Sequence, residues 1–313
     1  MYKVYDDAEF GDGGAVTETL TEGWALPALR ASDRPTPADL TARRDGMAAL
    51  SGGDPAPGVE TLDLVLGGVP CVVCEPPLPG ASIVYFHGGG YRLGSAAFST
   101  PFGTHLAAAT GARVTVVDYR LAPEHPFPAA IHDAVAVHAA LLEDGRPAPI
   151  AAGDSAGGGL AAALAVAAAA SGVPGPRGLV LMSPWLDLTC AAGTYASRAA
   201  ADQLFSLDSA RQATDLYLQG HDPKDPLASP LLADLASFPP TLVMASTDEV
   251  LLEDGAALAS GLALAGVPVL ASFESGRPHA WPAVLAGSAE SAAALESVGR
   301  FVAGLCRQDP DQG

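Results

Sequence analysis

A serine flanked by glycines lies where a short apolar stretch meets a long Ala-rich one, in Gly153-Asp154-Ser155-Ala156-Gly157. The pattern G-x-S-x-G is typical of a nucleophilic serine on a sharp turn between a strand and a helix. Small flanking residues let the strand and helix approach, and the turn exposes the hydroxyl at the start of the helix. The competing interpretation is a glycine-rich turn with an incidental serine, but the strand-turn-helix context favours a nucleophile. We therefore expect Ser155 to attack a carbonyl carbon.

Three consecutive glycines, Gly88, Gly89 and Gly90, follow His87 at the end of another apolar stretch. Without Cβ atoms, backbone N–H groups can face a common point, as a developing oxyanion requires. We expect the N–H groups of Gly88, Gly89 and Ala156 to form an oxyanion hole. A phosphate-binding loop is the alternative, but the triplet contains no lysine and no G-x-x-x-x-G-K pattern. We expect His87 itself to be structural.

A serine nucleophile requires a base that takes its proton and an acid that orients the base. The turn at Ser155 resembles the nucleophile turn of the α/β-hydrolases, in which the acid and then the histidine follow the serine along the chain. Only His221 and His279 follow Ser155. His221 lies in a polar stretch, whereas His279 comes after a strand-like run, so we expect His279 to be the base.

The acid should come just after the apolar run 241–245, where Asp248 and Glu249 are neighbours. Either carboxylate can hold an imidazole N–H and stabilise the imidazolium. Adjacent side chains point apart, so only one of the two can reach the base. The residues alone leave this choice open.

Strand-like and helical stretches alternate from residue 59 onward. This alternation favours a parallel sheet covered by helices on both faces. The first sixty residues are expected to form short helices between loops, and residues 187–235 a polar insertion. The expected strands are 61–66, 71–74, 82–86, 113–117, 149–152, 178–182, 241–245 and 267–273, and the expected helices are 129–142, the Ala-rich segment from 156, 209–218, 255–265 and 289–306.

The composition argues against several classes of partner. The chain has 313 residues and is 49% hydrophobic, enough for a large core without disulfides or metal. With 16 basic and 35 acidic residues its net charge is −19, which disfavours nucleic acid and anionic membranes as partners. The acidic N-terminal sequence does not resemble a secretory signal, so we expect a cytoplasmic protein.

Two of the four cysteines, Cys71 and Cys74, are spaced as C-x-x-C within a strand-like run. Three extended residues separate their Cα atoms by roughly 10 Å, too far for a disulfide. No second cysteine pair lies nearby to complete a zinc site. We expect core thiols and no metal.

Four motifs together resemble the hormone-sensitive-lipase-like esterases, the bacterial family IV, over about Leu62 to Phe301. They are His87-Gly88-Gly89-Gly90, the run from Asp118 to Ala130, Gly153-Asp154-Ser155-Ala156-Gly157 and Ser183-Pro184-Trp185-Leu186-Asp187. The resemblance implies an α/β-hydrolase fold, with a mostly parallel eight-stranded sheet flanked by helices and a helical cap. It divides the chain into an N-terminal cap segment (1–60), core (61–186), cap insertion (187–235), core (236–308) and tail (309–313).

The resemblance also bears on the acid and on the charged run 118–130. The family's usual D-P-L-x-D-E-G run aligns with Glu249 to Gly255, which places Glu249 in the catalytic register and leaves Asp248 as the alternative acid. The same resemblance implies structural roles for Asp118, Arg120 and Glu124.

The resemblance implies a serine carboxylesterase that needs no cofactor and acts on a small-molecule ester. The polar cap sequence has no long apolar stripe, so we expect short- to medium-chain acyl groups. Tyr91, Trp185 and Trp281 are beside the catalytic motifs and are candidates for the substrate pocket, with core packing as the alternative.

Other activities stay open at this point. A lactone hydrolase, a deacetylase or an amidase would use the same triad, and dehydratase relatives replace the serine that this chain retains. A binding protein, like the plant gibberellin receptors that resemble this family, would lack the histidine that His279 supplies. The sequence leaves a homodimer open.

Overall fold

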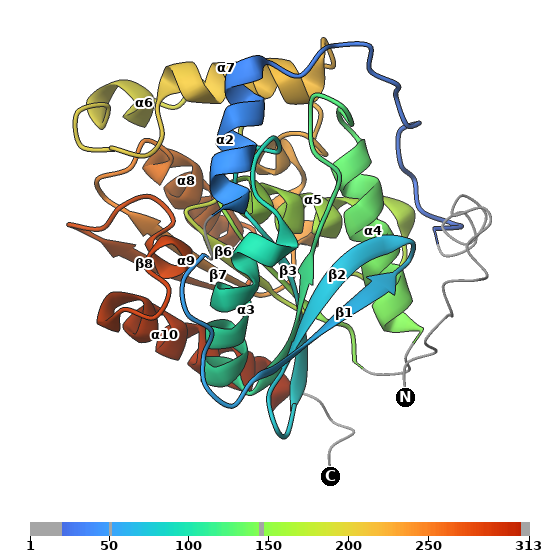
Figure 1. Ribbon diagram of the computed structural model, residues 1–313, viewed down its shortest axis with the longest axis vertical. Coiled ribbons are helices and arrows are strands. Elements are labelled where there is room, and N and C mark those ends of the chain that lie inside the picture. Colours follow the sequence, from blue (N-terminus) through green and yellow to red (C-terminus); the bar gives the residue numbers. More distant parts are fainter. Residues whose placement is uncertain (1–20, 50–51, 144–146, 308–313) are drawn as a thin grey trace.

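The computed structural model describes residues 21–49, 52–143 and 147–307, and within them one sheet of eight strands (Figure 1). The strand order is β1-β2-β4-β3-β5-β6-β7-β8. The first two pairings, β1 with β2 and β2 with β4, are antiparallel, and the others are parallel. The strands are β1 (Glu60–Leu66), β2 (Val69–Glu75), β3 (Ala81–Phe86), β4 (Ala112–Val117), β5 (Ile150–Asp154), β6 (Leu179–Met182), β7 (Thr241–Ser246) and β8 (Val269–Glu274). The predicted fold, a mostly parallel eight-stranded sheet, is confirmed.

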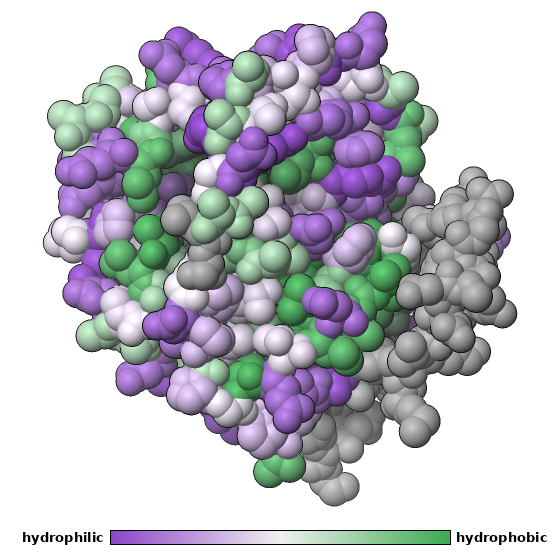
Figure 2. Space-filling view, viewed as in Figure 1, coloured by the Kyte–Doolittle hydropathy of each residue, from purple (hydrophilic) through white to green (hydrophobic). Residues whose placement is uncertain are grey.

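The central strands are continuous apolar runs because helices cover both of their faces. Every residue of β5, β6 and β7 is buried. The outer strand β1 instead exposes Leu62 and Val65. On the face shown in Figure 2, hydrophobic residues gather over the region of β1 and β2.

Two separate apolar clusters lie on the two faces of the sheet. Helices α3 and α10 contribute to one of them, and α4, α5 and α8 to the other. The helices are α2 (Ala38–Ala48), α3 (Ala96–Thr110), α4 (Ala129–Leu142), α5 (Ala156–Ser171), α6 (Thr194–Ser197), α7 (Leu207–Leu218), α8 (Leu252–Leu264), α9 (Trp281–Val284) and α10 (Ala289–Cys306), with short 3-10 turns η1 (Pro230–Leu232) and η2 (Leu235–Ser237).

Helix α3 is not among the helices that the sequence pattern predicts. Its apolar stripe is interrupted by serine, threonine and glycine, and Pro101 lies inside it. Ser95 begins the helix by accepting a hydrogen bond from Phe98 N at 3.1 Å. Tertiary packing against β2, β4 and α10 therefore stabilises a helix of weak local propensity.

Helices α2, α6 and α7, named here the cap helices, lie together at one end of the molecule (Figure 1). Arg44 of α2 donates to the carbonyls of Arg92 at 2.9 Å and Ala122 at 2.7 Å, and forms an ion pair with Glu124. These bonds fix α2 above the loops that follow β3 and β4. Residues 1–20 of the predicted N-terminal cap segment lie outside the described residues.

No helix in the described part of the chain is long and apolar enough to span a membrane. Cys71 and Cys74 are buried free thiols, as predicted. Among residues 21–49, 52–143 and 147–307, no cluster of histidine, cysteine and acidic side chains is arranged to hold a metal ion.

Candidate active site

Ser155 lies on a sharp turn between β5 and α5, with φ 51° and ψ −121°, a conformation rare for any residue but glycine. The two flanking glycines make the turn sterically feasible. A Cβ at Gly153 would lie 2.3 Å from the backbone of Gly157, and one at Gly157 would lie 2.0 Å from Phe86 O. The predicted strand-turn-helix context is confirmed, and the strained turn holds the hydroxyl at the start of α5.

The hydroxyl of Ser155 is the first member of a hydrogen-bonded chain of three buried side chains. Ser155 Oγ lies 2.9 Å from His279 Nε2, and His279 Nδ1 lies 2.9 Å from Glu249 Oε2. An ionised carboxylate only accepts, so Nδ1–H donates to Glu249 and leaves Nε2 to accept from the hydroxyl in the neutral ring. Such a ring can take a proton from Ser155 while the carboxylate stabilises the imidazolium.

Hydrogen bonds from neighbouring strands hold the loop that carries His279. Ser246, at the end of β7, donates to Arg277 O at 2.7 Å, and Ala280 N donates to Ser183 Oγ at 2.9 Å. These contacts fix the backbone on both sides of His279, so the imidazole is positioned before any substrate enters.

The two neighbouring carboxylates, Asp248 and Glu249, make different contacts. Glu249 is fully buried against His279. Asp248 instead accepts a hydrogen bond from Gly276 N at 2.6 Å, in the turn before His279. Asp248 therefore stabilises the loop before His279. Of the two carboxylates, Glu249 is the one that contacts the imidazole ring.

Opposing effects act on the pKa of His279. Burial lowers it, but the hydrogen bond and charge of Glu249, together with the charges of Asp202 and Asp154, outweigh burial. The net effect raises the pKa of His279 above its usual value. A higher pKa strengthens the imidazole as a proton acceptor but keeps it protonated to a higher pH.

In the glycine loop, the structure contradicts the predicted role of Gly88. Its N–H donates to Asp154 Oδ1 at 2.8 Å, so the prediction that Gly88 is an oxyanion donor is wrong. Within the described residues, Gly89 N and Gly90 N have no hydrogen-bond partner, and both residues line the cavity at Ser155. Ala156 N, at the first position of α5, has no carbonyl of a preceding helical turn to bond.

Asp154 positions this loop from beneath. Its buried carboxylate accepts from Gly88 N and from the Tyr85 hydroxyl. Burial raises the pKa of Asp154, although these hydrogen bonds act against burial. His87 bonds to Gly88 O through Nδ1 at 2.7 Å and stacks on Tyr119, so it has the structural role expected of it.

The charged residues of the run 118–130 are engaged in structural contacts, as predicted. Asp118 accepts from Ala96 N at 2.8 Å at the start of α3, and Arg120 forms an ion pair with Asp133 at 2.7 Å. Glu124 pairs with Arg44 of α2.

A cavity of about 670 Å³ opens at Ser155 and His279. Its apolar walls come from α3, α9, α2 and the segment before α7, and its main apolar and aromatic residues are Phe98, Phe102, Leu204, Phe205, Val284 and Met47.

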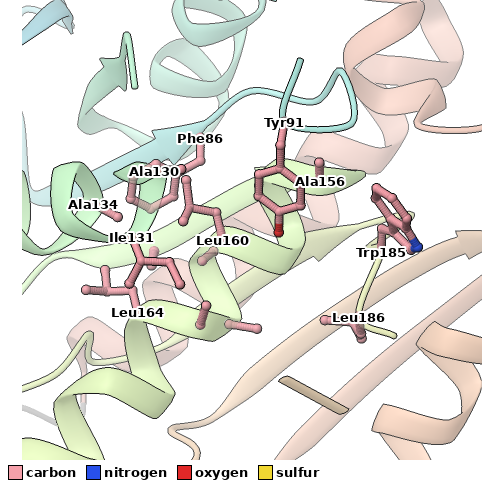
Figure 3. Close-up of a cluster of buried hydrophobic side chains, with 14 of the residues drawn as sticks. Phe86, Tyr91, Ala130, Ile131, Ala134, Ala156, Leu160, Leu164, Trp185 and Leu186 are labelled. Atoms are coloured by element: carbon pink, nitrogen blue, oxygen red, sulfur yellow. The ribbon is translucent and has the colours of Figure 1, made fainter. Parts of the chain in front are cut away.

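The three aromatic residues predicted for the pocket do not line this cavity, so that prediction is wrong. Tyr91 and Trp185 pack beside α5 with Ala156 and Leu160 (Figure 3), and Tyr91 also stacks on Tyr217 at 4.0 Å. Trp281 is fully buried in the cluster on the other face of the sheet. Proximity to a motif in sequence does not determine whether a ring faces substrate or core.

Phe205 is a site residue that sequence reasoning missed. Its ring stacks on the His279 imidazole, with centroids 5.7 Å apart and planes at 16°. Asp202 holds this segment, because its Oδ1 accepts from Leu204 N and Phe205 N while its Oδ2 accepts from Val250 N at 2.9 Å. No motif marks these residues, because the contact depends on how the insertion folds back onto the core.

Comparisons with known proteins place the chain in a family. A family model described as alpha/beta hydrolase fold matches residues 83–283. An acetyl-hydrolase of Streptomyces hygroscopicus is 40% identical over 225 residues, covering 71% of this chain and 75% of the relative. A carboxylesterase of Mycobacterium tuberculosis is 36% identical over 258 residues, covering 76% and 78%.

The structural comparison leads to the same group. The crystal structure of a hormone-sensitive lipase from a metagenome library superposes with a TM-score of 0.81 at 36% identity, covering 94% of this chain and 98% of that one. An esterase from the bacterial hormone-sensitive lipase family gives a TM-score of 0.82 at 33% identity with the same coverage. The chain belongs to the α/β-hydrolase family and, within it, to the hormone-sensitive-lipase-like carboxylic ester hydrolases that its motifs predict.

Proposed function

We propose that this chain hydrolyses esters of short- to medium-chain carboxylic acids, acetate foremost, through a covalent acyl-serine. One observation carries the proposal: the hydrogen-bonded chain from Ser155 through His279 to Glu249 ends on the wall of a cavity. The strained backbone at Ser155 supports it, as do the N–H groups of Gly89 and Gly90, which have no hydrogen-bond partner in the described part of the chain.

The reaction begins when neutral His279 accepts the Ser155 proton at Nε2. Oγ forms a bond to the ester carbonyl carbon, and the displaced electron pair moves to the carbonyl oxygen. The N–H groups of Gly89, Gly90 and Ala156 are our oxyanion donors. Collapse of this intermediate breaks the bond to the alcohol oxygen, which leaves with the proton from His279.

The second half repeats these steps with water. His279 takes a proton from water, the hydroxide attacks the acyl carbon, and Ser155 leaves with that proton as the free acid is released. Glu249 stays ionised throughout and stabilises the imidazolium. Every atom and proton is supplied by substrate, water and these side chains.

Aromatic rings line the cavity that contains Ser155. They are Phe98 and Phe102 from α3 and Phe205 from the insertion. Acetate is our first choice because the relative from Streptomyces hygroscopicus carries the name acetyl-hydrolase.

A second candidate is removal of an acetyl group from a larger natural product. A cavity of about 670 Å³ is far larger than an acetyl group, so a bulky alcohol or amine fits beside the acyl group. Hydrolysis of a lactone or an amide by the same three side chains belongs to this alternative.

p-Nitrophenyl esters of increasing chain length, from acetate through butyrate to dodecanoate, test the proposal. We expect kcat/KM to be highest for the short esters and to fall steeply for dodecanoate. The Ser155→Ala variant is the control and should lose turnover on every ester while keeping its thermal unfolding midpoint within a few degrees. Wild-type protein without turnover on any ester would overturn the proposal and favour a binding protein.

Three further expectations stay proposals. The division into core (61–186 and 236–308) and cap (1–60 and 187–235) is testable by deleting the insertion and assaying folding. A cytoplasmic location is testable by cell fractionation, and a homodimer by sedimentation.

A further inference from the structure

Two arginines that line the active-site cavity have no acidic partner in the described chain. Arg92 follows the glycine loop and is 3% exposed, which makes it the only buried arginine or lysine among the described residues. Arg43 lies on the exposed side of α2 and lines the same cavity. The positive charges of both therefore act on the space that receives substrate.

The hydrogen bonds of Arg92 go to neutral oxygens. Nη1 donates to Gln212 Oε1 at 2.6 Å, and Nη2 donates to Ser209 Oγ at 3.0 Å and Ser209 O at 3.2 Å. Nε has no partner within the described residues. Arg92 Nε lies beside the glycine loop. A Cβ atom built on Gly90 would be 3.7 Å from this nitrogen. These contacts fix the guanidinium in place without neutralising its charge.

The other arginines of this acidic protein show the contrast. Several of them form ion pairs with acidic side chains: Arg34, Arg44, Arg113, Arg120, Arg277 and Arg300. For Arg43, by comparison, the described residues supply no hydrogen bond and no ion pair. Arg43 and Arg92 therefore line one cavity with no ion-pair partner among the described residues, although acidic residues outnumber basic ones by 35 to 16 in the chain.

Burying a cation without an anion is costly, so such a site is favourable only when something else balances the charge. Burial and the neighbouring charge of Arg43 lower the pKa of Arg92 to about 10, and the charge of the exposed Asp39 acts in the opposite direction. Arg92 therefore stays protonated at neutral pH, and a bound anion would relieve both effects.

We propose that Arg43 and Arg92 form an anion-recognition subsite in the active-site cavity, and that the preferred substrates are esters carrying a carboxylate or similar oxyanion away from the scissile bond. This inference rests on the proposed ester hydrolysis and narrows its substrate class. The anion would neutralise the buried guanidinium and orient the ester toward Ser155.

The anionic group of the substrate is carried either by the acyl group or by the alcohol. Two matched pairs of esters distinguish these two positions of the charge. The acyl pair is mono-p-nitrophenyl glutarate against p-nitrophenyl pentanoate. The alcohol pair is 4-(acetoxymethyl)benzoate against 4-(acetoxymethyl)benzamide. The measured quantity is the ratio of kcat/KM for the anionic and the neutral member of each pair.

We expect the wild-type ratio to exceed one for at least one pair. Arg92→Gln should lower that ratio about tenfold or more, as expected for loss of a charged hydrogen-bond donor. Arg43→Gln, at an exposed position that leaves the core intact, should lower it about two- to fivefold. Arg211→Gln, on an exposed position of α7 outside the cavity, is the matched control and should leave the ratio unchanged.

Binding to the Ser155→Ala variant, measured by calorimetry with the intact anionic and neutral esters, makes the test independent of turnover. Tighter binding of the anionic ester that Arg43→Gln weakens would support the subsite even if Arg92→Gln fails to fold. The inference is overturned if both pairs give ratios of one or less in the wild type, or if Arg43→Gln and Arg92→Gln leave the ratio unchanged. Turnover of the neutral esters in that case would leave the proposed function intact.

Discussion

Replacing Glu249 with glutamine should slow ester hydrolysis severely while leaving the fold in place. Glu249 is fully buried, and Oε2 lies 2.9 Å from His279 Nδ1, so the substitution removes a buried negative charge that contacts the imidazole. The equivalent amide substitution in a serine-protease triad costs about 10⁴ in kcat, because the imidazole takes the wrong tautomer. We expect a loss of about 10³ to 10⁴ in kcat for Glu249→Gln.

The same substitution should move the pH dependence of kcat/KM. Glu249 is the main reason that the pKa of His279 lies above its usual 6.5, and burial alone acts in the opposite direction. In the wild type, kcat/KM should therefore fall as the pH drops through a value above 6.5. In Glu249→Gln the residual activity should persist to a lower pH, because His279 then loses its proton more readily.

Two matched variants make this test specific. Asp248→Asn keeps the shape of a side chain that contacts Gly276 N rather than the ring, so we expect less than about a tenfold loss of kcat/KM. Glu249→Asp keeps the charge but withdraws it by one methylene, and a displacement of about 1 Å is expected to cost about 10² in kcat. Rates on p-nitrophenyl acetate from about pH 5 to 9 at constant ionic strength give all these values. A large loss in Asp248→Asn together with near wild-type activity in Glu249→Gln would refute the assignment of the acid.

Three further predictions concern the turn, the His279 environment and the core. Gly157→Ala places a Cβ 2.0 Å from Phe86 O and should lower the free energy of unfolding by about 3 kcal/mol or more, measured by urea denaturation; a loss below about 1 kcal/mol would contradict the turn geometry. Asp202→Asn removes a negative charge that raises the pKa of His279, so the acid limb of kcat/KM should move to lower pH, and an unmoved limb would argue against this charge effect. Burial raises the pKa of Asp254 to about 7 from 3.8, so the folded protein holds a proton that the unfolded chain releases. Between about pH 4 and pH 8 the free energy of unfolding should fall by roughly 4 kcal/mol more in the wild type than in Asp254→Asn, and parallel curves would exclude this.

The fold, Ser155 and His279 follow from local sequence patterns, whereas the choice of Glu249 over Asp248 depended on the resemblance to the family IV esterases. Strands that are buried on both faces are continuous apolar runs, and the turn at Ser155 requires glycine at fixed positions. Both features can therefore be recognised in the sequence. The order of the motifs then brings the candidate residues to one edge of a parallel sheet.

The parts that sequence did not predict depend on contacts between distant segments. The N–H of Gly88 is taken by Asp154, which lies 66 residues away in the chain. The rings of Tyr91 and Trp185 face the core because α5 packs against them, and Phe205 reaches His279 only because Asp202 holds the insertion onto the loop after β7. Local spacing carries no information about any of these contacts.

Mass spectrometry of the intact protein during turnover tests the central claim, that Ser155 forms an acyl-enzyme, most directly. The wild type quenched in acid after mixing with p-nitrophenyl acetate should gain the mass of one acetyl group, which peptide mapping should locate on Ser155, and Ser155→Ala should gain none. Turnover without such an adduct would contradict the account. So would acetylation of another residue, if Ser155→Ala were acetylated there too and kept full activity.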